Sequence, residues 1–311
     1  MRDGLQAPLL TPILVLALSM SAVAGPLEDA NGAYERGDYS AAVLLFRPLA
    51  EQGNAQAQAQ LGYMFNAGLG VRQEYEQAAA WYRRSAESGN AAGQYNLAVM
   101  YDKGHGVPQD YSLAVLWYRK AATQGDAEAQ LNLGVKYAKG EGVPRDYTQA
   151  LEWHRKAAGQ GLASAQYNLG LMYENGRGVS RDYAKALTFY RKAADQGLAS
   201  AEYNLGLMYD KGRGVQQDYA EAVRWYRKSA NQGNIRAQLN LGVKYAEGEG
   251  VPQDYVQAHL WFSLAATRSL SAADKETRDE AIENCDLVAS MMTTSQIAEA
   301  QKLAGDWMPS K

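Results

Sequence analysis

The chain has little of several residue types that carry chemistry or cross-links. Its 311 residues include one cysteine, Cys285, so no disulfide forms within the chain and stability must come from packing. No histidine lies within twenty residues of Cys285, which favours a half-buried small apolar role over a nucleophile and leaves pairing between molecules open. The three histidines, His105, His154 and His259, stand far apart, which favours packing or surface roles over metal binding.

Sequence motifs of catalysis are also missing. The chain contains no Gly-x-Ser-x-Gly elbow, no phosphate-binding glycine loop ending in Lys-Ser or Lys-Thr, and no His-Glu-x-x-His. A recurring Gly-x-Gly-Val element lacks the third glycine of a dinucleotide loop. We therefore expect no enzyme activity, no cofactor and no metal.

The charge balance is weakly acidic, with 31 Lys and Arg against 34 Asp and Glu. Both signs alternate along the chain, so no basic face is available for phosphate backbones, and nucleic acid is not an expected partner. A hydrophobic content of 47% is typical of a folded soluble chain.

The first residues have the pattern of an export signal. A positive start at Arg2 precedes an apolar stretch over residues 9–23, and the small residues Ala22 and Ala24 predict a signal peptide over residues 1–24 with cleavage after Ala24. An uncleaved membrane anchor is the alternative, and Pro12 argues against it. No later apolar run is long enough to span a bilayer, so we expect a periplasmic or secreted monomer.

A period of 36 residues dominates the rest of the sequence. Small residues recur with this step, and each is followed by a Gly-x-Gly-Val element and then an aromatic residue. The small residues are Gly62, Ala98, Gly134, Gly170, Gly206 and Gly242. Such a period is the signature of a solenoid rather than of one globular core.

Each unit has the pattern of two helices. In the fourth, Ala165, Leu169 and Tyr173 recur at helical spacing, and the glycines at 176 and 178 end that helix because Gly adopts positive φ without a clash. A carboxylate then stands where the second helix begins and is expected to cap it. These carboxylates are Glu74, Asp110, Asp146, Asp182, Asp218 and Asp254. The Gly inside the first helix costs about 1 kcal/mol relative to Ala, which predicts close approach of the partner helix.

The segment AQYNLGLMYENGRGVSRDYAKALTFYRKAADQG, residues 165–197, resembles a Sel1-like repeat, a relative of the tetratricopeptide repeat. The resemblance implies an all-α fold, a right-handed α-solenoid of stacked helical hairpins that serves protein–protein contact. We divide the chain into the signal peptide, a partial repeat at 25–53, six repeats at 54–268 and a helical cap at 269–311.

The cap departs from the period, because Arg278 stands where the next glycine is due. A helix is expected from Ala272 to about Met291, and Thr293 with Gln296 predicts a capping box that opens a final helix. A longer repeat lies inside the array, since residues 131–150 match residues 239–258 at all but three positions, three units apart. Recent duplication explains this match, and a ligand that itself repeats is the alternative.

The candidate binding residues form a row of amides on the first helices. They are Gln60, Asn96, Asn132, Asn168, Asn204 and Asn240. In tetratricopeptide-type stacks the first helices line the concave face, where an amide can pair with the backbone of an extended peptide. The alternative, compatible with the first, is that the amides only join neighbouring hairpins.

One turn further on, Lys136 and Lys244 alternate with Met100, Met172 and Met208. The lysines suit an acidic partner, and a solvated helix face is the alternative. We therefore expect a non-enzymatic scaffold of the cell envelope that binds a protein or peptide. One rival is an amide hydrolase that acts on cell walls or β-lactams. This chain lacks the cysteine pairs of the relatives linked to such amides, which disfavours that rival. The other rival is a purely structural spacer.

Overall fold

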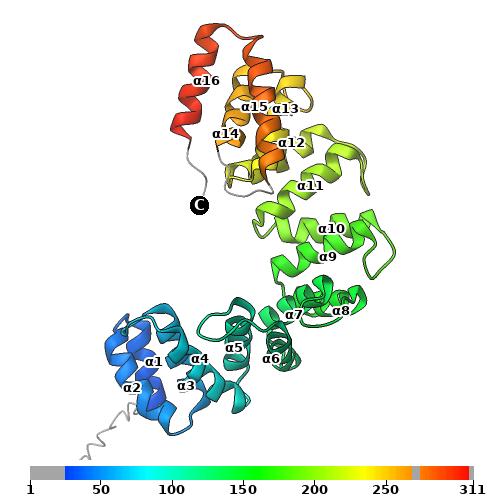
Figure 1. Cartoon of the computed structure of the whole chain (residues 1–311). Helices are drawn as coiled ribbons and strands as arrows, with labels where there is room; N and C mark the ends of the chain where they lie inside the picture. The colour runs from blue at the N-terminus through cyan, green and yellow to red at the C-terminus, as the bar shows by residue number, and fades with distance from the viewer. Residues whose placement is uncertain (1–24, 268–273, 308–311) are drawn as a thin grey trace, which may run out of the picture.

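The computed structural model describes residues 25–267 and 274–307, so the predicted signal peptide lies outside the described residues (Figure 1). Within these ranges the chain forms sixteen α-helices and no strand, which confirms an α-solenoid of stacked hairpins. The helices follow one curved path from the N-terminal to the C-terminal end. They are α1 (Pro26–Glu35), α2 (Tyr39–Glu51), α3 (Ala55–Ala67), α4 (Tyr75–Glu87), α5 (Ala91–Lys103), α6 (Tyr111–Thr123), α7 (Ala127–Lys139), α8 (Tyr147–Gly159), α9 (Ala163–Asn175), α10 (Tyr183–Ala194), α11 (Ala199–Lys211), α12 (Tyr219–Asn231), α13 (Ile235–Glu247), α14 (Tyr255–Thr267), α15 (Lys275–Ala289) and α16 (Thr294–Asp306).

The two glycines in the loop of each hairpin are required for different structural reasons. Gly176 ends α9 in the left-handed conformation at φ 66°, as predicted. Gly178 is also left-handed, at φ 70°, but a Cβ there would lie 2.3 Å from the carbonyl oxygen of Tyr147 in the preceding hairpin. The second glycine therefore lets each loop pack on the backbone of its neighbour.

The glycine inside the first helix is explained by an aromatic ring. A Cβ on Gly170 would lie 2.5 Å from the ring of Tyr190, which belongs to the second helix of the same hairpin. The predicted close approach is thus confirmed, and the group that approaches is a side chain rather than the helix backbone. Phe262 lies over Gly242 in the same way.

The predicted carboxylate caps are present in five of the six units. Asp182 accepts a hydrogen bond from the backbone N–H of Lys185, and the other four aspartates do the same at their helices. The prediction for Glu74 is wrong, because its side chain makes no cap bond. Its extra methylene group makes glutamate a poorer cap than aspartate.

Two polar side chains join one hairpin to the next at several junctions. Gln160 donates to the backbone oxygen of Gly125 at 2.8 Å and to the amide oxygen of Gln130 at 2.9 Å. Arg155 donates to the hydroxyl of Tyr173 in the following unit at 2.8 Å. Both contacts recur through the array, so hydrogen bonds as well as apolar packing fix the stacking.

The cap covers the last repeat helix from two sides. Helices α15 and α16 both pack on α14, and Trp307 after α16 meets Trp261 with ring centroids 6.4 Å apart. Because α14 is covered on both sides, it is apolar nearly all round, with Leu264 where the other units carry Arg or Lys. The capping box of Thr293 and Gln296 is confirmed, whereas α15 ends at Ala289, before the predicted Met291.

Candidate functional site

The predicted row of amides lies on the first helices of the six hairpins, and every one of these side chains is partly exposed. Three of them contact the preceding hairpin through a tyrosine. Asn204 lies near the hydroxyl of Tyr167, and the same relation holds for Asn132 with Tyr95 and for Asn240 with Tyr203. Burial raises the pKa of each of these hydroxyls, and the nearby amide acts in the opposite direction.

The other amides have no such partner. Asn96 and Asn168 follow units that carry Ala59 and Leu131 in place of the tyrosine. Within the described part of the chain, no hydrogen bond engages their side chains or that of Gln60. The row therefore divides into amides that lie beside a tyrosine of the preceding hairpin and amides that do not.

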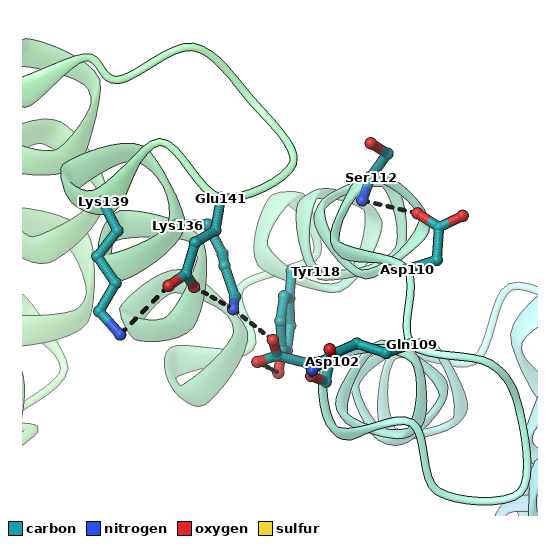
Figure 2. Close-up of polar contacts among 8 residues, drawn as sticks. All are labelled: Asp102, Gln109, Asp110, Ser112, Tyr118, Lys136, Lys139 and Glu141. Atoms are coloured by element: carbon teal, nitrogen blue, oxygen red, sulfur yellow. Dashed lines mark hydrogen bonds and ion pairs between the residues drawn. The ribbon is translucent and has the colours of Figure 1, made fainter.

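The two lysines of the predicted contact row are buried, and Figure 2 shows Lys136 directed toward Asp102 and Glu141. Lys136 is 5% exposed, and its ammonium group pairs with Asp102 of the preceding hairpin and with Glu141 at 2.7 Å. It also lies over the ring of Tyr111, 4.5 Å from the centroid. Burial by itself lowers the pKa of Lys136, but the hydrogen bonds and charges of the two carboxylates outweigh burial and raise it.

Lys244 repeats this arrangement with Asp210 and Glu249, each at 2.6 Å. The solvated-face interpretation of the two lysines does not hold, and their charges are already neutralised within the chain. A contact with an acidic partner does not fit them either. The methionines of the same row are also buried, so this row couples hairpins.

Two clefts lie over the first helices near the cap. The smaller has a volume of about 360 Å³ and is lined by Tyr167, Tyr203 and Asn204, with Arg236 at the start of α13. The larger, about 530 Å³, lies beyond Tyr203 and contains Asn240. Asp274, at the start of α15, also lines the smaller cleft, and Glu280 of α15 lines the larger one. We call this surface over α9, α11 and α13 the groove.

The groove contains residues that the sequence analysis did not single out. Tyr167 and Tyr203 stand where three of the other units have Ala or Leu and one has Tyr95, and Arg236 stands where other units have Gln, Ala, Glu or Ser. Variation at an exposed position of the repeat is the signal that marks Arg236.

The remaining candidate groups are engaged in packing. His154 is 2% exposed, its ring lies over Gly134, and burial lowers its pKa to about 4. The hydroxyl of Ser263 lies 3.2 Å from Nδ1 of His259 and 3.4 Å from Sγ of Cys285. The sequence did not indicate this contact, because His259 and Cys285 are far apart along the chain. Burial raises the pKa of the Cys285 thiol, which therefore stays protonated and is a weak nucleophile. In the described ranges, none of the helices has the length and apolar character needed to cross a bilayer.

Comparison with known proteins agrees with this architecture. The model of the Sel1 repeat matches seven consecutive segments, and the first covers the unit that we described as partial. The segments are residues 19–54, 55–90, 91–126, 127–162, 163–198, 199–234 and 235–270. A search of the curated proteins finds no match.

Two solved structures are similar over most of the chain. A Sel1 repeat protein from Oxalobacter formigenes is 33% identical, with a TM-score of 0.72, over 79% of this chain and 98% of that one. The protein c5321, a protective antigen of uropathogenic Escherichia coli with an SLR fold, is 34% identical with a TM-score of 0.59, over 90% and 67% of the two chains. Sel1 repeat proteins typically mediate protein–protein interaction, and their fold is generally a non-catalytic scaffold. The stacked 36-residue hairpins, the matching repeat model and these two structures together show that the chain belongs to the Sel1 repeat family.

Proposed function

We propose that this protein is a non-enzymatic scaffold that binds an extended segment of a partner protein in the groove. The observation that carries the proposal is the pair of clefts over α9, α11 and α13, in which Asn204 and Asn240 are partly exposed. Lys244, Asp210 and Glu249, which line the larger cleft, are paired with one another, so we assign the contact to the amides.

The chemistry of the groove suits a peptide backbone. An amide side chain offers both a donor and an acceptor, and so does a tyrosine hydroxyl. Asn204 and Asn240 are spaced by one repeat along the array, so they meet successive parts of an extended chain. Such contacts give affinity without requiring a particular sequence, and the neighbouring side-chain pockets add selectivity.

We also propose that the protein works outside the cytoplasm, after cleavage behind Ala24. Helix α1 begins at Pro26, so cleavage there removes none of the first hairpin. N-terminal sequencing of the protein from an envelope fraction checks this proposal. A first residue of Gly25 supports it, and an intact Met1 in the mature protein contradicts it.

Affinity capture tests the groove. The chain from Gly25 onward is immobilised and exposed to envelope extract, and the wild type is compared with the double variant Asn204→Ala/Asn240→Ala. We expect the variant to lose the captured partner. Because each amide lies beside a tyrosine hydroxyl, a stability loss of at most about 1 kcal/mol per site is expected and is measured by thermal unfolding.

The matched control lies on the opposite helix layer. Leu116 of α6 is 44% exposed on a second helix, and Leu116→Ser should leave capture unchanged. A variant with Asn96→Ala and Asn168→Ala reports on the unused amides at no cost in hydrogen bonds within the chain. Equal capture by the wild type and the Asn204/Asn240 variant contradicts the groove, and loss of capture in Leu116→Ser places the contact on the outer surface.

A further inference from the structure

The smaller cleft differs from the equivalent place three repeats earlier. The constant 36-residue period lets the two places be compared position by position. The cleft has Tyr167, Ser200, Asn234 and Arg236, where the earlier place has Ala59, Ala92, Asp126 and Glu128. Every one of these changes favours an anion: two hydroxyl donors are gained, one negative charge is removed and another is replaced by a positive charge.

The sequences that directly follow Glu128 and Arg236 are nearly the same. Between residues 131–150 and 239–258 only three of twenty positions differ. The buried contacts of Lys136 are likewise repeated at Lys244. The stacking contacts of α7 and α13 are therefore alike, while the residues at the start of these helices differ in charge.

The electrostatic surroundings of the tyrosines differ accordingly. At the earlier place, burial raises the pKa of Tyr95, and the charges of Glu128 and Asp126 raise it further. In the cleft, burial raises the pKa of Tyr167 and Tyr203, and the charge of Arg236 acts in the opposite direction, against the contributions of Glu174 at Tyr167 and of Glu280 at Tyr203. The cleft thus has a cation, Arg236, where the earlier place has the acidic residue Glu128, and Asp274 is the acidic residue in its lining.

Arg236 is available to a ligand. Its side chain is exposed, and it makes no ion pair or hydrogen bond with other residues in the described ranges. It lies in the first turn of α13, where the positive end of the helix dipole adds to its charge. The hydroxyls of Tyr167 and Ser200 lie in the same cleft and stay protonated at neutral pH, so they can donate hydrogen bonds.

We propose that this cleft binds a single carboxylate of the peptide held in the groove, with Arg236 as the charged partner and the hydroxyls of Tyr167 and Ser200 as further donors. The inference rests on the proposed function and names the partner chemistry for that groove. One carboxylate fits better than a phosphate, because Asp274 lines the cap side of the cleft and opposes a second negative charge. The carboxylate can belong to an acidic side chain or to a chain terminus.

Selection from random decapeptide libraries identifies the ligand chemistry. One library displays peptides with blocked C-termini and the other with free C-termini, and both are selected on the chain from Gly25 onward. We expect Asp or Glu to be enriched at one fixed position in the blocked library if the ligand is a side chain. If the ligand is a terminus, only the free library should yield binders.

A double-mutant cycle then assigns the contact. Arg236→Gln should weaken binding of the selected peptide about tenfold, as expected for a lost charge-assisted hydrogen bond. Changing the peptide carboxylate to its amide should cost the wild type the same factor and should cost Arg236→Gln almost nothing. The matched control is Glu128→Gln in the earlier copy, which should alter affinity less than about twofold. Thermal unfolding of Arg236→Gln should match the wild type, since Arg236 is exposed and unpaired.

The outcomes separate the two proposals. Peptides that bind without a carboxylate, or that bind Arg236→Gln as well as the wild type, overturn the inference and leave the groove intact, provided that Asn204→Ala/Asn240→Ala weakens them. Stronger binding of a phosphopeptide than of its Glu counterpart overturns the choice of carboxylate. Failure of both libraries to yield a peptide sensitive to the Asn204 and Asn240 changes overturns the groove and the inference together.

Discussion

The ammonium group of Lys244 lies 2.6 Å from the carboxylate of Asp210 in the preceding hairpin, and both side chains are more than nine-tenths buried. Such a pair is costly to break, because removal of one partner leaves the other charged and desolvated. It connects two neighbouring units at the groove end of the array. The relation therefore links the stability of the stack to the surface that we propose for binding.

Lys244→Met tests this pair. The variant leaves Asp210 buried without its cation, and we expect the free energy of unfolding in urea to fall by about 3 kcal/mol. Adding Asp210→Ala should restore most of the loss, because Met172 and Ala138 already pack together at the equivalent positions of another junction. A double variant as unstable as the single one would show that the pair does not act as a unit.

The glycine in the first helix gives a second prediction. Gly170→Leu forces a side chain into the ring of Tyr190, and overpacking of this kind costs about 3 kcal/mol. Gly159→Ala is the control, since nothing lies within 4 Å of a Cβ built there and alanine favours helix. We expect the control to equal or exceed the wild type in thermal unfolding. Unchanged unfolding of Gly170→Leu contradicts the packing that we describe.

Glu202 is an acid where the other units have a buried glutamine. It is 3% exposed and accepts a hydrogen bond from Gln232 at 2.8 Å. Burial raises its pKa, so the folded chain holds the proton more tightly than the unfolded chain. The free energy of unfolding is therefore undiminished at a pH below the ordinary glutamate pKa. It falls as the pH rises through the raised pKa of Glu202 in the folded chain.

Glu202→Gln should therefore stabilise the protein at pH 7, by about 1 kcal/mol. The gain should shrink toward zero near pH 3, well below the ordinary glutamate pKa of 4.5, where the wild-type carboxyl is protonated in both states. Thermal unfolding of both proteins at the two pH values measures the effect. A gain that is independent of pH would assign it to packing rather than to ionisation.

His154 makes the stability fall in acid. Its pKa is lowered from 6.5 to about 4 in the fold, so the unfolded chain takes up a proton first as the pH drops. Stability contributed by the neutral ring is present above the unfolded pKa and is lost between about pH 6.5 and pH 4. The full difference corresponds to roughly 3 kcal/mol.

His154→Phe should abolish that loss. The choice follows from the chain itself, because Tyr118 and Tyr190 bond to acidic residues of their own units, whereas His154 and Phe262 occur in units with Ala138 and Ala246. A tyrosine at position 154 would lack its acidic partner. Urea unfolding at pH 7 and pH 4.5 should show a smaller difference for the variant, and an undiminished difference contradicts the assignment.

The sequence by itself determined the repeat, its hairpins and most of its local signals. The 36-residue period, the positive φ of Gly176 and Gly178, the aspartate caps and the Thr293 capping box are local properties, readable because each depends on a few neighbouring residues. The one failed cap, Glu74, differs from the others by a methylene group. The prediction that the hairpins stack into a solenoid came from the resemblance to the Sel1 repeat.

Only the tertiary structure decided which side chains of a row face inward. In the sequence Lys136 has the pattern of a surface cation, yet it pairs with Asp102 of another hairpin. The amides of Asn96 and Asn168 differ from that of Asn204 because the preceding unit has Ala or Leu, and not a tyrosine, at the matching position. The cleft at Arg236 also depends on the cap, which crosses the array where the period has ended. These contacts join residues a whole repeat apart, so they depend on how the hairpins stack, and a helical pattern within one unit carries no information about them.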